Sequence, residues 1–304
     1  MKIGLVSAIL ENYDFKKMID TVSEIGYECV EVACWPNAKA ERRYAGVCHI
    51  DVSTLDDAKA AEILSYCKSK NVEISSLAFY PNTMDGNLEK RAANIEHLYK
   101  VIDASQKLGI NLVTTFIGRD QTKTVEENLE LVKEIWIPIV RYAEEKKVRI
   151  AIENCPMLFD GDQWPGGQNL MTTPVIWRKV FEILGSDYIG INYDPSHFVW
   201  QMIDYIQPLY EFKDKIFHVH YKDIKLFREK LKECGTMAYP LQYMKPKLPG
   251  LGDVDWGKYV SALTDIGYKG YTCIEVEDKA FEDSEERILD SLRLSLRYMR
   301  QFVI

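Results

Sequence analysis

The sequence has no long apolar run and no closely spaced pair of cysteines. No stretch approaches the roughly 20 apolar residues that a membrane span needs. The N-terminal segment MKIGLVSAIL soon meets Glu11 and Asp14 and lacks the long apolar centre and cleavage site of a signal peptide. The seven cysteines are scattered and form no CxxC motif, which indicates reduced thiols and no disulfide framework. We therefore expect a soluble, cytoplasmic protein.

Positive charge is also scarce. The chain has 38 Lys and Arg against 46 Asp and Glu, which gives a formal net charge of −8. Nucleic acids and anionic membranes are bound by clustered Lys and Arg, so neither is an expected partner. No Gly-rich dinucleotide fingerprint or Walker-type loop follows the first apolar run, and this disfavours an open nucleotide-binding sheet.

The chain does contain a regular alternation of two kinds of segment. Short β-branched or aromatic runs occupy 2–8, 27–33, 72–79, 111–117, 148–154, 188–194, 215–221 and 270–277. Amphipathic stretches lie between them at 14–25, 54–70, 88–108, 124–147, 172–184, 198–213, 255–266 and 282–302. Eight strand-then-helix units without a composition shift predict an α/β fold, a (β/α)₈ TIM barrel that forms one domain over residues 1–304.

Two helix-to-strand joints are nearly the same, EIGYECVEV at 24–32 and DIGYKGYTCIEV at 265–276, and each predicts a left-handed glycine at a helix end.

The loops at 34–53, 80–87, 155–171 and 222–254 are longer than a turn requires. In a barrel they lie at the C-terminal face, where active sites are built. We expect the loop at 222–254 to be a lid, a wall of the site or a subunit contact, and Trp164 to close over the site.

Four of the predicted strands end in polar residues of one parity. Glu153 ends RIAIE, Asp194 ends YIGINYD, His220 lies in IFHVHY, and Glu275 lies in TCIEVE. Because strand side chains alternate, the apolar residues of each strand meet the helices and these four point into the barrel. Three buried carboxylates need a compensating positive charge. A Glu, Asp, His and Glu set suits Mn²⁺, Mg²⁺, Co²⁺ or Zn²⁺ better than a structural zinc site.

The motifs also resemble those of a known family. IEN at 152–154, DPSH at 194–197, HVHYKD at 218–223, LGDVDW at 251–256 and IEVE at 274–277 resemble the sugar phosphate isomerase/epimerase group of the xylose isomerase-like TIM barrels, which includes ketose 3-epimerases and inosose dehydratases. The resemblance implies that Glu153, Asp194, His220 and Glu275 hold one divalent metal ion, with Mn²⁺ the first choice. It also implies that Glu153 and Glu275 are the catalytic acid/base pair.

Other residues are candidates for contact with a substrate. By the resemblance, His197 and His218 hydrogen-bond substrate hydroxyls or order the metal ligands. Lys222 neutralises a carboxylate, an enolate or a phosphate, or is a solvated loop lysine. Trp35 stacks on a sugar or anchors its loop. His49, in the long loop at 34–53, is a further candidate substrate contact or a bystander.

These residues predict a metal-dependent isomerase or epimerase that moves a carbon-bound proton of a small carbohydrate or polyol. A lyase that dehydrates an inosose or a 3-keto-glycoside would use the same site. A phosphodiesterase of the DNA-repair endonuclease type is disfavoured, because it needs a histidine-rich zinc cluster and the chain has five histidines. The intact acid/base pair disfavours a non-catalytic sugar-binding protein. The aromatic loops are compatible with a homodimer or homotetramer.

Overall fold

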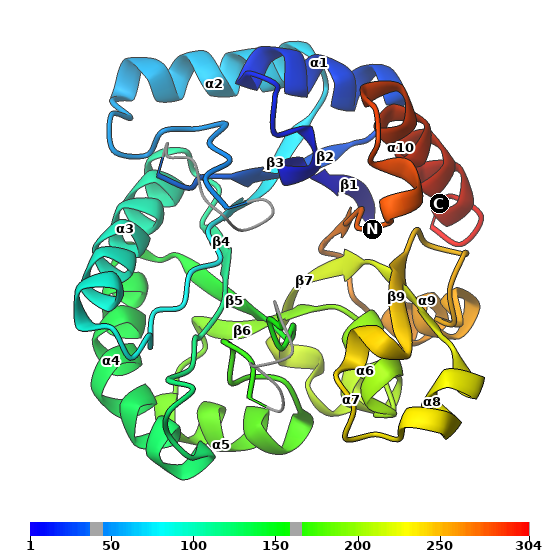
Figure 1. The fold of residues 1–304 in the computed structure, drawn as a ribbon. Coiled ribbons are helices and arrows are strands. Elements are labelled where there is room, and N and C mark those ends of the chain that lie inside the picture. The colour runs from blue at the N-terminus through cyan, green and yellow to red at the C-terminus, as the bar shows by residue number, and fades with distance from the viewer. Residues whose placement is uncertain (37–44, 159–165, 304) are drawn as a thin grey trace.

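Eight parallel strands close into one barrel with helices around it (Figure 1). The chain is described here from a computed structural model, for residues 1–36, 45–158 and 166–303. The barrel strands are β1 (Lys2–Val6), β2 (Cys29–Ala33), β3 (Glu73–Ala78), β4 (Leu112–Thr115), β5 (Arg149–Glu153), β6 (Ile189–Tyr193), β7 (Ile216–Tyr221) and β10 (Tyr271–Ile274). They are neighbours in chain order, and β10 pairs with β1 to close the barrel. The predicted (β/α)₈ barrel is confirmed.

The outer helices follow the strands in sequence. They are α1 (Phe15–Ile25), α2 (Asp57–Ser69), α3 (Leu88–Lys107), α4 (Val125–Lys146), α5 (Pro174–Leu184), α6 (Ser196–Gln201), α7 (Gln207–Glu211), α9 (Trp256–Asp265) and α10 (Glu285–Met299). Both repeated joints contain the predicted left-handed glycine, Gly26 at φ 99° and Gly267 at φ 72°. Among the helices of the described residues, none is long and apolar enough to cross a membrane.

The helix predicted over 198–213 is in fact two short helices. Met202 adopts a left-handed conformation, with φ 59°, and ends α6. The Asp204 carboxylate then accepts hydrogen bonds from the backbone N–H groups of Ile206 and Gln207, which starts α7 in a new direction. The split places α6 directly after β6, at the end of the barrel where the site lies.

Outward-facing strand residues pack against the helices, as their alternation predicts. The buried Tyr193 of β6 is an example: its ring centroid lies 5.7 Å from those of Trp177 and Phe198 and 5.9 Å from that of Tyr259. The same strand turns Asn192 into the barrel, where it is buried. Each strand therefore separates an aromatic and aliphatic layer from a polar interior.

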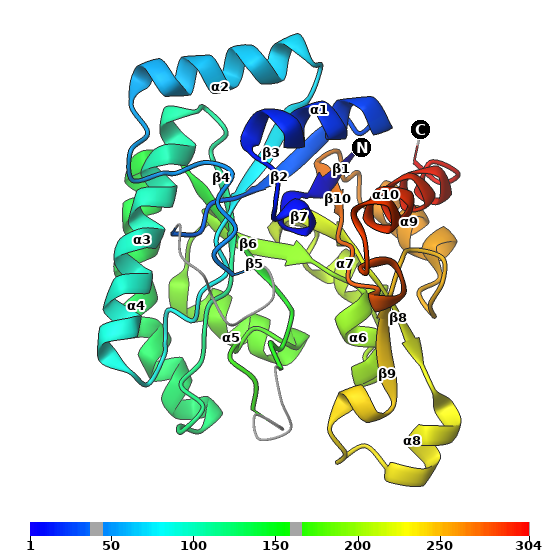
Figure 2. The ribbon, with the colours of Figure 1, turned by 45° about the horizontal axis from the view of Figure 1, so that its top comes forward.

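The long loop at 222–254 contains secondary structure of its own. An antiparallel hairpin of β8 (Asp223–Leu226) and β9 (Met244–Lys247) encloses α8 (Arg228–Cys234) and the 3₁₀ turn η4 (Pro240–Gln242). Figure 2 shows these elements projecting beyond the body of the barrel. They form a wall of the cavity described below, which was one of the roles expected for this loop.

Candidate active site

A cavity of about 560 Å³ opens at the C-terminal ends of the barrel strands. Its lining includes Glu153 of β5, His220 of β7 and Glu275, which directly follows β10. This is the face on which barrel enzymes of this type carry their active sites. Three of the four predicted metal ligands therefore lie together in one cavity.

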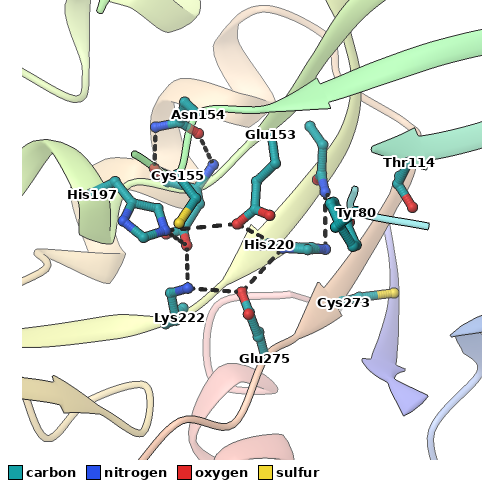
Figure 3. A network of polar contacts seen from close by, with 12 residues as sticks. Tyr80, Thr114, Glu153, Asn154, Cys155, His197, His220, Lys222, Cys273 and Glu275 are labelled. Carbon is teal, nitrogen blue, oxygen red and sulfur yellow. Dashed lines mark hydrogen bonds and ion pairs between the residues drawn. The ribbon is translucent and has the colours of Figure 1, made fainter. Parts of the chain in front are cut away.

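These three side chains turn toward one another (Figure 3). The Nδ1 atom of His220 lies 3.2 Å from Oε2 of Glu275 and 3.5 Å from Oε1 of Glu153. All three donor atoms lie within 4.8 Å of one another, close enough to hold one metal ion. Glu153 and Glu275 come from strands that are not neighbours, and the imidazole of His220 lies between them.

The fourth predicted ligand, Asp194, reaches the group through two cationic side chains. Its Oδ2 lies 3.2 Å from Nε2 of His197 and 3.3 Å from Nζ of Lys222. Lys222 in turn lies 3.1 Å from Oε2 of Glu275 and 3.3 Å from Oε2 of Glu277, and only 3% of its surface is exposed. Lys222 is thus a buried lysine of the site and not a solvated loop residue.

Five buried polar atoms of this group have no hydrogen-bond partner of acceptable geometry among the described residues. They are Oε1 of Glu153, Oδ2 of Asp194, Nε2 of His197, Nδ1 of His220 and Oε2 of Glu275. Buried polar atoms rarely remain in this condition, because leaving one unsatisfied costs about 1–3 kcal/mol. Each of the four predicted ligands contributes one such atom, and three oxygens and one nitrogen fit a divalent cation.

The other ring nitrogen of His220 is held by the barrel interior. Nε2 lies 3.0 Å from Oε2 of Glu31 and 3.0 Å from Nδ2 of Asn192. Tyr80 donates a 2.7 Å hydrogen bond to the second carboxylate oxygen of Glu31. A proton on Nε2 that is donated to Glu31 leaves the Nδ1 lone pair facing Glu153 and Glu275. Carboxylates commonly orient metal-binding histidines in this way.

The local backbone explains why the carboxylates point where they do. Asn154 exchanges two 2.8 Å hydrogen bonds with the backbone of Asp194, which ties the end of β5 to the end of β6. Asn169 donates to the carbonyls of Glu153 and Cys155, at 2.8 and 2.7 Å. Oδ1 of Asp194 accepts the N–H of Ser196, which leaves Oδ2 for the site.

Burial and the neighbouring charges act in opposite directions on the acids. Burial acts to raise the pKa of Glu153, but His197, His220 and Lys222 outweigh it and hold that pKa below its ordinary value. Burial raises the pKa of Glu275, although Lys222 opposes the shift. Burial acts to lower the pKa of Lys222, but Glu275, Glu277 and Asp194 hold it well above its ordinary value. The two carboxyls proposed as acid and base thus have different environments.

The remaining candidate substrate-binding residues lie at different depths in the barrel. Trp35 and His197 line the cavity. His218 is fully buried, with Nδ1 3.0 Å from Oδ1 of Asn192 and Nε2 3.1 Å from Oγ of Ser75. Its place is therefore beneath His220, where it supports Asn192, and it is not among the residues that line the cavity.

His49 is not brought to the cavity either. It is buried, with Nδ1 3.0 Å from Oγ of Ser7 and Nε2 3.2 Å from the carbonyl of Leu10. Both ring nitrogens are thus used to fix the loop at 34–53 against the segment that directly follows β1. Trp164 lies outside the described residues.

Sequence reasoning did not assign Tyr80, Asn154 or Asn192 to the site. Asn192 lies two residues before Asp194 and shares its inward parity, which was the available signal, whereas Asn154 directly follows Glu153 and has the opposite parity. Tyr80 lies just after β3, and nothing in its local sequence separates it from other loop tyrosines.

Comparison with known proteins identifies the family of the chain. A family model for the xylose isomerase-like TIM barrel matches residues 19–300. The chain belongs to this family. An inosose dehydratase of Lactiplantibacillus plantarum is 29% identical over 120 residues, and the match spans 38% of each of the two chains.

Solved structures of xylose isomerase-like barrels superpose over the whole chain. D-psicose 3-epimerase from Clostridium cellulolyticum H10, solved with D-tagatose, gives a TM-score of 0.72 at 17% identity and covers 100% of this chain and 99% of its own. The IOLI protein, solved with a bound zinc atom, gives 0.71 at 18% identity and covers 99% of both chains. At these identities the likeness establishes the fold.

Proposed function

We propose that this barrel is a divalent-metal-dependent isomerase or epimerase of a small carbohydrate or polyol. The observation that carries the proposal is that Glu153, Asp194, His220 and Glu275 each have one buried atom that makes ion-pair contacts but no hydrogen bond of acceptable geometry among the described residues. These four residues would hold the ion, and their oxygen and nitrogen donors suit Mn²⁺, the first choice, as well as Mg²⁺, Co²⁺ or Zn²⁺. The zinc atom bound by the IOLI protein, which has a similar fold, supports a divalent ion in this barrel.

Glu153 and Glu275 are the proposed acid/base pair. A bound ion would supply the positive charge that polarises a substrate carbonyl and stabilises the charge left when the neighbouring carbon loses its proton. One carboxylate removes that proton, and the other delivers one from the opposite side. Delivery to the same carbon epimerises it, and delivery to the adjacent carbon converts an aldose to a ketose. The position of both carboxylates beside Nδ1 of His220 supports this assignment.

Three further residues are proposed to bind the substrate. His197 and Lys222 line the cavity beside Asp194 and can each donate a hydrogen bond to a substrate oxygen. Trp35, on the side of the cavity formed by the first strands, offers an aromatic ring against which a sugar can stack.

A lyase is the second candidate, and the match to an inosose dehydratase favours it. Expulsion of a β-hydroxyl needs the same proton abstraction and then a proton donor at the leaving oxygen. Lys222, 3.1 Å from Glu275, is placed to assist such a donor. The two candidates differ in the product, because a dehydratase removes one water and an epimerase conserves the mass.

Solvent deuterium exchange tests both candidates. The protein loaded with Mn²⁺ is incubated in D₂O with ketoses, aldoses and inososes, and carbon-bound deuterium and product mass are measured. We expect exchange into at least one substrate, reduced by about 10² or more in Glu153→Gln and Glu275→Gln because each removes an acid or base. Exchange without loss of water supports the isomerase or epimerase, and loss of water supports the lyase. Protein that binds Mn²⁺ but exchanges no substrate proton contradicts the proposal.

A further inference from the structure

The cavity extends well beyond the group of proposed catalytic residues. Its volume of about 560 Å³ lies in the range of roughly 300–1,000 Å³ that sites for drug-sized ligands occupy. A single sugar is smaller than such a ligand and would contact the polar floor formed by Glu153, His220 and Glu275. Room is therefore left on the side of the hairpin.

That side is lined by six uncharged side chains, which we call the apolar shelf. They are Met157, Leu158, Trp200, Ile224, Leu241 and Met244. They come from the loop after β5, from α6 and from both strands and the turn of the hairpin, so segments far apart in sequence converge on one surface. Large apolar surfaces of this kind mark binding sites for apolar groups.

The shelf is built on a packed support. On β8 and β9, alternation turns Ile224 and Met244 to the same side of the hairpin, and both are buried in a small hydrophobic cluster with Trp200. Lys225 and its cross-strand partner Lys245 lie on the other side and are exposed. The hairpin thus presents Ile224 and Met244 to the cavity, whereas Lys225 lies on the opposite side and Lys245 is exposed but also contributes to the lining.

The charges around the cavity indicate an uncharged substrate. Lys222 is surrounded by the carboxylates of Asp194, Glu275 and Glu277, and Lys247 lies 3.0 Å from Oδ1 of Asp278. The remaining lysines of the described lining, Lys245 and Lys279, are exposed at the surface. A phosphate deep in the cavity, beside Lys222 or Lys247, would therefore meet a lysine that is already paired with carboxylates.

We propose that the substrate is an uncharged sugar that has a ketone on its ring and carries an apolar aglycone, aryl or alkyl, and that the apolar shelf holds the aglycone while the sugar lies over the catalytic floor. The proposal rests on the function proposed above and adds the substrate class. The shelf lies on the same continuous cavity as Glu153 and Glu275, so one molecule can reach both.

Paired glycosides test the proposal. Phenyl and methyl β-D-glucopyranosides, galactopyranosides and xylopyranosides are titrated into the Mn²⁺-loaded full chain, with saturation-transfer NMR as the readout. We expect at least one phenyl glycoside to bind about tenfold more tightly than its methyl partner, as apolar pockets discriminate by this order. Its aryl protons should receive the stronger saturation. D-glucose 6-phosphate is the anionic competitor.

A pair of variants locates the effect. Leu241 and Leu251 lie in the same long loop and are similarly exposed, at 46% and 45%, but of the two only Leu241 lines the cavity. Leu241→Asp places a short charged group on the apolar shelf. It should reduce the preference in binding affinity for phenyl over methyl glycosides several-fold, whereas Leu251→Asp should leave this preference unchanged.

Two results overturn the aglycone proposal: no phenyl glycoside binds more tightly than its methyl partner, or D-glucose 6-phosphate binds more tightly than every phenyl glycoside. Neither affects the proposed function, which fails separately if the chain binds no divalent metal or catalyses no proton exchange with any sugar.

Discussion

Glu31 is the residue through which the barrel interior controls the orientation of His220. It is fully buried, 3.0 Å from Nε2 of His220, and held by Tyr80. Burial acts to raise the pKa of Glu31, but His220 and His218 outweigh it and keep that pKa below its ordinary value. An ionised Glu31 accepts the Nε2 proton and keeps Nδ1 free to bind a metal ion.

We therefore expect Glu31→Gln to weaken Mn²⁺ binding by about 10–100-fold, the usual effect of losing the partner of a metal-binding histidine. Isothermal titration of the metal-free protein with Mn²⁺ measures the change. Glu73→Gln is the matched control, because Glu73 is an exposed glutamate at the start of the neighbouring strand. Equal Mn²⁺ affinity in wild type and Glu31→Gln would show that Glu31 does not orient the ligand.

His49 is expected to matter for stability rather than for chemistry. Burial lowers its pKa, although its contact with the carbonyl of Leu10 opposes the shift. The unfolded chain, with a histidine pKa of about 6.5, therefore takes up a proton first as the pH falls. Stability from neutral His49 is present above about pH 6.5 and is lost as the pH falls through the folded-state pKa.

The melting temperature of wild type should therefore fall between pH 7 and pH 5 more steeply than that of His49→Gln, with Mn²⁺ binding at pH 7.5 unchanged in the variant. Differential scanning calorimetry over this pH range gives both slopes. Parallel slopes, or loss of the metal in His49→Gln, would contradict the structural role.

For single residues, the sequence predicts which side chains point into the barrel. It does not predict how far below the cavity each of them lies. The parity of HVH places both His218 and His220 inside. Only the three-dimensional arrangement shows that His220 reaches the cavity and that His218 lies one layer below it, against Ser75 and Asn192. Depth depends on the stagger between neighbouring strands, which no single strand records.

The hairpin of β8 and β9 depends on one carboxylate. Asp223 accepts hydrogen bonds from the N–H groups of Ile224, Gly250 and Val254 and from Nε1 of Trp256, at 2.8–3.1 Å. Burial raises the pKa of Asp223, and these donors oppose the shift. The motif LGDVDW at 251–256 thus ends the long loop by returning it to the start of the hairpin.

Asp223→Ala should lower the free energy of unfolding by about 2–4 kcal/mol, because it leaves several buried donors without an acceptor. Trp256→Phe removes one of the four hydrogen bonds and should cost less. Urea unfolding followed by circular dichroism measures both. A smaller loss in Asp223→Ala than in Trp256→Phe would show that the carboxylate does not anchor the hairpin.

At the scale of elements the sequence predicts the strands and most helices, because these have regular periodicity. It does not predict the break within 198–213, which depends on the left-handed Met202 and the cap by Asp204. It identifies 222–254 as a functional loop but not as a hairpin. The hairpin strands β8 and β9 have four residues each, and β9 contains Pro246. They are therefore too short to give a periodic signal in the sequence.

Closure of the whole barrel depends on close approach at Gly4. A Cβ at this position would lie 2.4 Å from Sγ and 2.6 Å from the carbonyl oxygen of Cys29, and 2.9 Å from Sγ of Cys273. Gly4 pairs with both of these residues, where the first strand meets the second and the last.

Gly4→Ala should therefore destabilise the fold by roughly 1–3 kcal/mol through overpacking. Gly257→Ala in α9 is the control, since its nearest neighbour atom lies 3.5 Å away and alanine favours a helix. Chemical denaturation of both variants gives the comparison. Equal stability of wild type and Gly4→Ala would show that this approach does not constrain the barrel.

The whole molecule brings together residues from 31 to 275 that the sequence separates by up to 244 positions. The eight-fold alternation predicts the closed barrel, and closure places the ends of β5, β6, β7 and β10 side by side. The contacts that Lys222 and Glu31 make with residues of other strands depend on both the closure of the barrel and the packing of its interior. The sequence alone therefore does not predict them.

Glu153 and Glu275, with Asp194 and His220, are proposed to hold one divalent ion. Elemental analysis tests this on the protein purified without added metal and then equilibrated with Mn²⁺ and dialysed, beside the Glu153→Gln, Glu275→Gln double variant. We expect about one divalent ion per folded wild-type chain and little or none in the equally folded variant. Wild-type protein that binds no Mn²⁺, Mg²⁺, Co²⁺ or Zn²⁺, or a variant that binds as much as wild type, would contradict the proposal.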